Sequence, residues 1–101
     1  MTAIQPAGKL PIAVTQNHID LLSLSAHKLN GPKGIGALYV RHGIDLTPQA
    51  TGGTQERTRR AGTENVAAIA GLGVACELAA REMETEPTRL AQLCDQLEQA
   101  I

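Results

Sequence analysis

The chain contains almost no aromatic residues. Of its 101 residues only Tyr39 is aromatic, and phenylalanine and tryptophan are both absent. Because aromatic side chains usually supply much of the core volume of a small domain, their scarcity indicates a segment that belongs to a larger structure. Hydrophobic residues make up 43% of the chain and charged residues 19%, which excludes an intrinsically disordered chain.

The chain also lacks an excess of charge and a long apolar run. A formal net charge of −1 provides no general attraction to nucleic acid or to an anionic membrane. No apolar stretch reaches the roughly 18 residues of a membrane-spanning helix, and the first residues do not have the layout of a signal peptide. We therefore expect a cytoplasmic protein that binds neither nucleic acid nor a membrane.

Cysteine is scarce as well, since Cys76 and Cys94 are the only two. Two cysteines at this spacing form neither a disulfide framework nor a metal-ligand pattern, so no metal site is predicted. Cys76 lies in an apolar run and Cys94 lies on the apolar stripe of a predicted helix. We expect both to be buried structural residues, because apolar surroundings suppress the reactive thiolate.

Short apolar runs predict two buried strands, at residues 19–25 and 35–40. Gly31, Pro32 and Gly34 require a turn between them. The first 18 residues are interpreted as a loop with one short strand around residues 10–14. Residues 41–63 are rich in glycine and threonine and predict a long connection, and connections of that length are often functional.

Helical patterns begin after this connection. Thr63 is the predicted N-cap, with Glu64 in the first turn, where its charge suits the helix dipole. Residues 66–80 are apolar on nearly every face, which predicts a buried helix, and its glycines 71 and 73 would allow close approach of a neighbour. Pro87 marks a break or the start of a second, amphipathic helix, which is expected over about residues 88–101. Its apolar stripe is Leu90, Leu93, Leu97 and Ile101.

The segment Ser25-Ala26-His27-Lys28 directly follows the first predicted strand. A lysine at the end of a buried strand can be desolvated, which favours attack of its amine on a carbonyl. A serine hydroxyl and an imidazole beside it are suitable donors to a phosphate. Together these groups suit an aldehyde cofactor that carries a phosphate, usually pyridoxal phosphate. A plain β-hairpin explains the same turn without any chemistry, so the residues alone leave both interpretations open.

Residues 21–40 resemble the cofactor-lysine segment of the cysteine desulfurases, a branch of the class V aminotransferase family. The resemblance covers the chain from about Ala3 to its end, through Gln5-Pro6-Ala7-Gly8-Lys9-Leu10-Pro11-Ile12, Gly52-Gly53-Thr54-Gln55-Glu56-Arg57 and Arg60-Ala61-Gly62-Thr63-Glu64-Asn65-Val66. It implies an α/β fold, as part of the large domain of a fold-type I pyridoxal-phosphate transferase with a mainly parallel sheet and packing helices. Residues 1–83 would form the C-terminal part of the cofactor-binding large domain, and residues 84–101 a helix leading into the small domain.

The resemblance implies roles for five residues. Lys28 would form the Schiff base with pyridoxal 5′-phosphate and later move the proton at the substrate α-carbon. Ser25 and His27 would donate to the cofactor phosphate, and Gln5 to the phenolic oxygen of its ring. Thr63 would reach the phosphate of a neighbouring subunit, which requires a homodimer. Two arginines, Arg57 and Arg60, are expected to lie at the dimer interface or to order their loop.

Other positions depart from the family pattern. Thr2 stands where the family has the aspartate that pairs with the pyridine nitrogen. Neither Cys76 nor Cys94 matches the cysteine that receives the sulfur; in the family that cysteine and the arginine for the substrate carboxylate would lie beyond Ile101. We therefore expect a partial active site and an inactive chain when it is alone.

The implied reaction takes sulfur from L-cysteine and leaves alanine and an enzyme persulfide, for iron–sulfur cluster or thio-cofactor synthesis. A sulfur-acceptor protein such as an iron–sulfur scaffold would then be a partner. Two alternatives remain open: another class V enzyme, such as a selenocysteine lyase or an aminotransferase, or a non-catalytic remnant that binds a homologous subunit.

Overall fold

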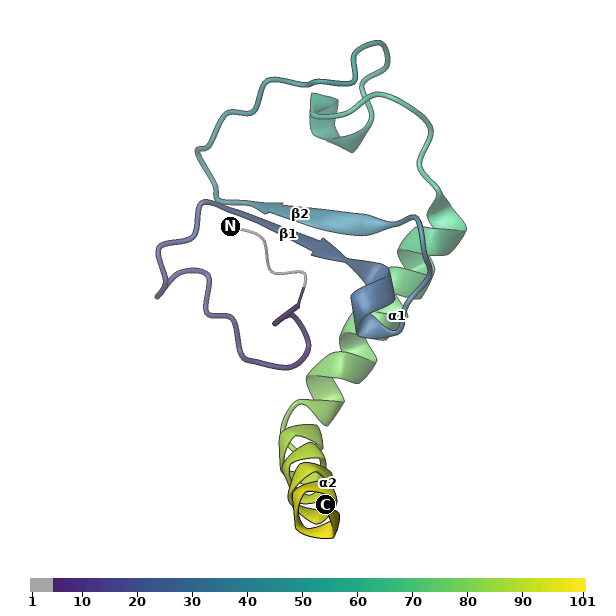
Figure 1. Cartoon of the computed structure of the whole chain (residues 1–101). Helices are drawn as coiled ribbons and strands as arrows, with labels where there is room; N and C mark the ends of the chain where they lie inside the picture. The colour runs from purple at the N-terminus through teal and green to yellow at the C-terminus, as the bar shows by residue number, and fades with distance from the viewer. Residues whose placement is uncertain (1–4) are drawn as a thin grey trace.

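The computed structural model describes residues 5–101, which form a β-hairpin, a long loop and two α-helices. Thr2, the position of the family aspartate, lies outside the described residues. In chain order the elements are β1 (Leu21–Ser25), the 3₁₀-helix η1 (Ala26–Leu29), β2 (Gly36–Val40), the 3₁₀-helix η2 (Glu56–Thr58), α1 (Val66–Glu82) and α2 (Glu86–Ala100). Figure 1 shows the hairpin beside α1, with the loop that carries η2 arching over β2.

The two strands pair antiparallel, with Leu21 opposite Val40 and Ser25 opposite Gly36. Both predicted strands are therefore present, each slightly shorter than expected. The expectation that they are buried is wrong: Leu22 is the only buried residue of the two strands, and Gly36, Ala37 and Leu38 are exposed. The hairpin has too few neighbours among the described residues to cover both strands. The mainly parallel sheet implied by the resemblance is not found in the described residues, whose two strands form one antiparallel sheet. The reason is the short connection through η1 and a turn, because parallel neighbours need a crossover of about a dozen residues or more.

The segment before the hairpin forms successive turns, so the short strand expected around residues 10–14 is wrong. The amide of Leu10 donates to the Pro6 carbonyl over 2.9 Å, and the amide of Asn17 donates to the Ala13 carbonyl over 2.9 Å. These local bonds replace strand pairing, and Pro11 has no amide proton to donate to a ladder. The segment packs against the hairpin through half-buried Ile12 and Val14.

Helix α1 begins two residues later than the sequence indicates. Its N-cap is Asn65, whose side-chain oxygen accepts a hydrogen bond from the Ala68 amide over 3.2 Å. The prediction of Thr63 as the cap is wrong, and Glu64 lies before the first turn. Asparagine caps helices at least as well as threonine, so Asn65 can serve as the N-cap in place of Thr63.

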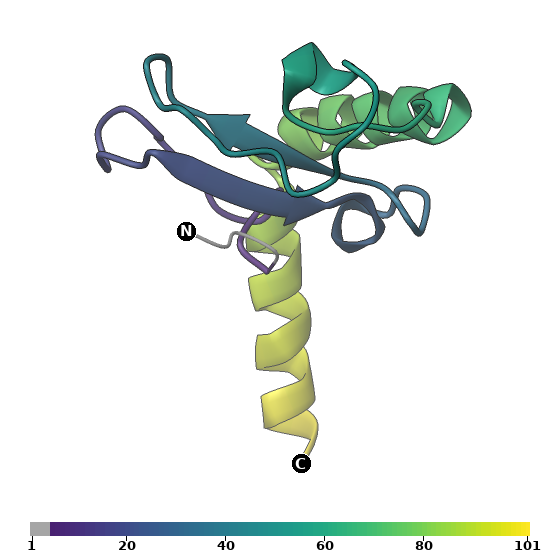
Figure 2. The ribbon, with the colours of Figure 1, turned by 90° about the horizontal axis from the view of Figure 1, so that it is seen from above.

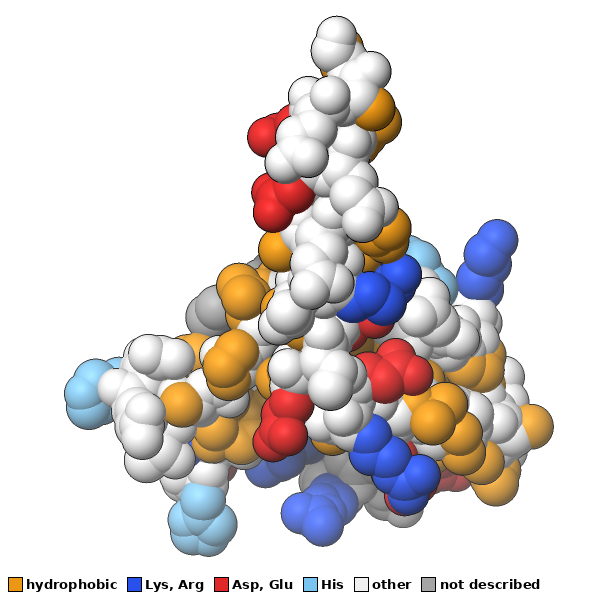
Figure 3. Space-filling view, turned by 90° about the horizontal axis from the view of Figure 1, so that it is seen from below, with side chains coloured by type: hydrophobic (Ala, Val, Ile, Leu, Met, Phe, Trp, Pro, Cys, Tyr) orange, Lys and Arg blue, Asp and Glu red, His pale blue; other side chains and the backbone are white. Residues whose placement is uncertain are grey.

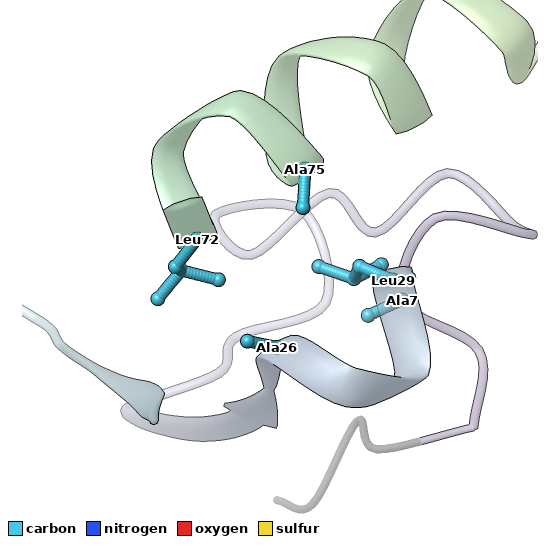
Figure 4. Close-up of a cluster of buried hydrophobic side chains, with 5 residues drawn as sticks. All are labelled: Ala7, Ala26, Leu29, Leu72 and Ala75. Carbon is cyan, nitrogen blue, oxygen red and sulfur yellow. The ribbon is translucent and has the colours of Figure 1, made fainter. Parts of the chain in front are cut away.

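One face of α1 is buried, and the expectation of a helix buried on every side is wrong. Ala68, Leu72 and Ala75 are buried, whereas Val66 and Val74 are 71% and 57% exposed. The buried face contacts η1, and Figure 4 shows Leu72 and Ala75 directed toward Ala26, Leu29 and Ala7. A two-stranded sheet and one short turn are too small to cover the rest of the helix surface.

Helix α2 begins at Glu86, about two residues earlier than expected, with Pro87 in its first turn. It extends away from the hairpin and α1 (Figure 2), and none of its residues is buried. Figure 3 shows hydrophobic side chains along one edge of this protruding helix and acidic ones along the other. The radius of gyration is 16.9 Å, compared with about 13 Å for a compact domain of this length. No helix among residues 5–101 is long and apolar enough to cross a membrane.

Candidate active site

Lys28 lies on η1, the single 3₁₀ turn between the two strands. The turn directs Ala26 and Leu29 inward, at 0% and 9% exposure, while His27 and Lys28 are exposed. Its end is set by Asn30, which takes the left-handed backbone conformation with φ of 60°. Asparagine tolerates this conformation better than most residues. Lys28 therefore projects from a short turn with an apolar inner side.

Ser25 and His27 lie together at the start of this turn. The Ser25 Oγ is 2.8 Å from the His27 Nδ1. In one tautomer the hydroxyl donates to Nδ1 and the opposite ring nitrogen carries a proton; in a protonated ring Nδ1 donates and the hydroxyl proton is available. In either state the pair offers an N–H or O–H donor to an anionic oxygen. Hydroxyl and imidazole thus meet here, and the residue that follows them in the chain is Lys28.

Lys28 also lines a crevice of about 740 Å³ between η1 and the two helices. Its walls include Gly31 and Pro32 on the turn and Gly71 and Glu82 on α1. A smaller apolar groove of about 260 Å³, which shares Leu29 with the crevice, contains none of the predicted cofactor residues. Of these two cavities, the crevice is therefore the one in which a ligand could contact Lys28.

Gln5 and Thr63 are both exposed, and their predicted cofactor roles stay predictions. Gln5 is exposed in the turn that precedes Ala7, and Thr63 is exposed in the loop before α1. Neither side chain forms a hydrogen bond with the segment from Ser25 to Lys28 in the described structure. The implied role of Thr63 toward a neighbouring subunit stays a prediction.

The loop before α1 is closed by its own side chains. Arg60 forms an exposed ion pair with Glu56 over 3.6 Å and donates to the Ala61 carbonyl over 3.0 Å. The Gln55 side-chain oxygen accepts from the Gly62 amide over 3.1 Å. Arg60 thus orders the loop, one of the two roles expected for it. The part played by Gln55 was not evident from the sequence, because a single glutamine in a loop gives no pattern.

Both cysteines are exposed, so the prediction that they are buried is wrong. Cys76 lies on α1 outside its buried face, and Cys94 lies on α2, which has no buried residue. The apolar sequence around each predicts core, but no element among residues 5–101 covers either side chain. No group of three or more histidine, cysteine or acidic side chains in this part of the chain is arranged to hold a metal ion.

A sequence profile of the family described as aminotransferase class-V matches residues 2–101. The chain belongs to this family. A cysteine desulfurase of Gluconacetobacter diazotrophicus is 58% identical over 99 residues, which cover 98% of this chain and 25% of the relative. A solved NifS-like protein superposes with a TM-score of 0.91 at 39% identity, covering 97% of this chain and 27% of that one. A structure titled SspA in complex with cysteine superposes over 75% of this chain and 22% of that one, with a TM-score of 0.72 and 52% identity.

The class-V chain therefore spans about a quarter of the length of the curated relatives it matches. The family depends on pyridoxal phosphate. The groups from Ser25 to Lys28 fit this cofactor chemically, because a primary amine can bond its aldehyde and the Ser25–His27 pair offers donors for its phosphate. The similarity to NifS-like structures also places the hairpin and α1 in a mixed α/β fold.

Proposed function

We propose that this chain is the cofactor-lysine segment of a pyridoxal-phosphate-dependent cysteine desulfurase. The observation that carries the proposal is the Ser25–His27 pair, 2.8 Å apart and followed directly by the exposed Lys28. The named cysteine desulfurases among the relatives support this branch of the family, as does the solved relative whose title includes cysteine.

In this proposal Lys28 binds the cofactor and carries the proton at the substrate α-carbon, and Ser25 and His27 bind the phosphate. The bound cofactor supplies an electron sink for cleavage next to the substrate amine. Gln5 donates to the ring oxygen, and Thr63 reaches the phosphate site of a second subunit in a homodimer. Residues 1–83 belong to the large domain and residues 84–101 lead toward a small domain.

The overall reaction breaks the bond between carbon and sulfur in L-cysteine. Sulfur passes to a thiol as a persulfide, and a proton replaces it at the β-carbon to give alanine. A sulfur-acceptor protein, such as an iron–sulfur scaffold, then receives the sulfur. The described residues place no thiol in the crevice that Lys28 lines, so the thiol of this reaction is assigned to another part of the whole enzyme.

The test compares labelling of the lysines in the 101-residue chain. The chain is incubated with pyridoxal 5′-phosphate, reduced with borohydride and mapped by peptide mass spectrometry. We expect the label on Lys28 to exceed that on Lys9 or Lys33, because the Ser25–His27 pair directly precedes Lys28.

Pyridoxal without the phosphate is the matched control and should label the three lysines without this preference. Preferential labelling of Lys9 or Lys33 by the phosphorylated form would contradict the proposal.

A further inference from the structure

Helix α1 approaches the Lys28 turn so closely that one of its positions has no room for a side chain. A Cβ atom at Gly71 would lie 2.6 Å from Cγ and 3.1 Å from Cδ of Pro32. Real Cβ atoms do not approach a ring carbon this closely, so any larger residue would move the proline or the helix. Glycine also weakens the interior of a helix relative to alanine, so helix formation alone does not favour it there.

The same helix face touches the residue before the proline. A Cβ atom at Gly31 would lie 3.0 Å from the Cβ of Ala75. Gly71 and Ala75 are four residues apart and therefore lie on one face of α1, one turn above the other. The helix thus contacts two consecutive residues, Gly31 and Pro32, through two consecutive turns.

These two residues close the turn that bears Lys28. The Gly31 amide donates to the Ala26 carbonyl over 2.9 Å, which bonds the end of η1 to its beginning. The Lys28 side chain is exposed, so its position is set by the backbone of this turn rather than by packing of its own. A shift of Pro32 would therefore be transmitted through Gly31 to the turn.

We infer that Gly71 is a positioning residue for Lys28, acting through its contact with Pro32. The inference rests on the proposed cofactor role of Lys28. Gly73 provides a matched comparison on the same helix, because a Cβ atom there meets nothing within 4 Å. Alanine at either position gives the same gain in helix propensity, but only at Gly71 does it collide with the turn.

The experiment measures the ratio of pyridoxyl label on Lys28 to that on Lys9 after borohydride reduction. Five forms of the full chain are compared: the unaltered chain, Gly71→Ala, Gly73→Ala, Pro32→Ala and the double variant Pro32→Ala/Gly71→Ala. Circular dichroism of each form reports its helix content. The probe is pyridoxal 5′-phosphate throughout.

Gly71→Ala is expected to lower the ratio about tenfold, since misplacing a reacting group by an ångström can cost up to about a hundredfold. Gly73→Ala should leave the ratio unchanged. Pro32→Ala removes the ring atoms that the new methyl group would meet, so the double variant should return to the ratio of Pro32→Ala alone. Recovery in the double variant would also support the inference if Gly71→Ala by itself lost helix content.

Equal ratios for Gly71→Ala and Gly73→Ala would overturn the inference while leaving the role of Lys28 intact. A double variant that stays as low as Gly71→Ala would overturn it too, because the proline would then not transmit the effect. Failure of the proposed function is measured separately, by the distribution of label over the lysines of the unaltered chain. Preferential label on Lys9 or Lys33 there would remove both proposals.

Discussion

Ser25 Oγ lies 2.8 Å from Nδ1 of His27, one residue before Lys28. The pair forms because β1 ends at Ser25 and the first turn of η1 brings residue 27 back beside it. Each partner can orient the other, so a phosphate oxygen near the pair would meet a donor that is already directed. This local relationship lies entirely within the described chain and needs no second subunit.

His27→Ala is expected to remove the preference of Lys28 for pyridoxal 5′-phosphate over pyridoxal. The substitution removes the ring donor and leaves the Ser25 hydroxyl without its partner, at a loss of about ten- to a hundredfold for one hydrogen bond to a charged group. The measurement is the ratio of label on Lys28 with the two reagents. His42→Ala, a change at an exposed loop histidine, is the control and should keep the preference. An unchanged ratio in His27→Ala would contradict the phosphate role.

Asn65→Ala is expected to destabilise the chain by about 1 kcal/mol, the usual effect of losing an N-cap. The reason is the lost hydrogen bond from the Ala68 amide to the Asn65 side chain. Urea denaturation followed by circular dichroism measures the change. Thr63→Ala is the matched control, since the exposed Thr63 does not cap α1. A larger loss of stability in Thr63→Ala than in Asn65→Ala would show that the cap is misassigned.

Cys76 and Cys94 are both expected to react with a thiol-specific reagent in the native chain. Both side chains are exposed, so modification requires no unfolding. The measurement compares the rates for the native chain and the chain in concentrated urea, with Cys76→Ser and Cys94→Ser used to separate the two sites. Native rates close to the urea rates are expected, and strong protection of either thiol would contradict the exposed placement.

The chain alone is expected to release no sulfide or alanine from L-cysteine, even with pyridoxal 5′-phosphate added. In the described residues no cysteine lines the crevice beside Lys28, so no thiol is placed to accept sulfur there. Sulfide and alanine are assayed with the purified chain and with Cys76→Ser and Cys94→Ser. Turnover on the order of 1 per second, abolished by either substitution, would overturn this expectation.

Acid is expected to reduce the helix content of α2. The Arg89 guanidinium, which hydrogen-bonds the Glu86 carboxylate, lowers the pKa of Glu86 below its ordinary value of 4.5. Because the pKa of Glu86 is lowered in the folded helix, the ionised carboxylate stabilises the helix at higher pH. This stabilisation is lost as the pH falls from 4.5 through the lowered pKa.

The measurement for this prediction is an acid titration of the helical circular dichroism signal. Glu86→Gln has no carboxylate at this position to protonate. Its titration curve should therefore lack the loss of helix signal below pH 4.5 that the unaltered chain shows. Glu98→Gln, at an exposed position elsewhere on α2, should keep that loss. Identical curves for all three forms would contradict the prediction.

The elements most accurately predicted from the sequence were those that depend on local pattern. The continuous apolar runs indicated β1 and β2, and Pro87 marked the start of α2. The order Ser25, His27, Lys28 also placed three candidate groups in one short stretch. Their contact was not evident, because it depends on the 3₁₀ turn that begins after β1.

Burial could not be predicted in the same way. Val66 and Val74 have the sequence pattern of core residues, yet both are largely exposed, because burial depends on which elements lie nearby. The same reason explains both cysteines. Gly71 was expected to allow close approach and does, whereas Gly73 was given the same interpretation and faces open space. Spacing along a helix identifies a face, but only tertiary contact shows which face is covered.

The contact between Gly71 and Pro32 also bears on the order of events during synthesis. A β-hairpin forms in about 1–10 μs once its residues are available, but a two-stranded hairpin alone is marginally stable in water. At about 5–20 residues per second, a ribosome needs roughly 1.5 to 6 s to proceed from Val40, the last residue of the hairpin, to Gly71. The Lys28 turn would therefore form and dissolve many times on the nascent chain before the helix that fixes its place has been made.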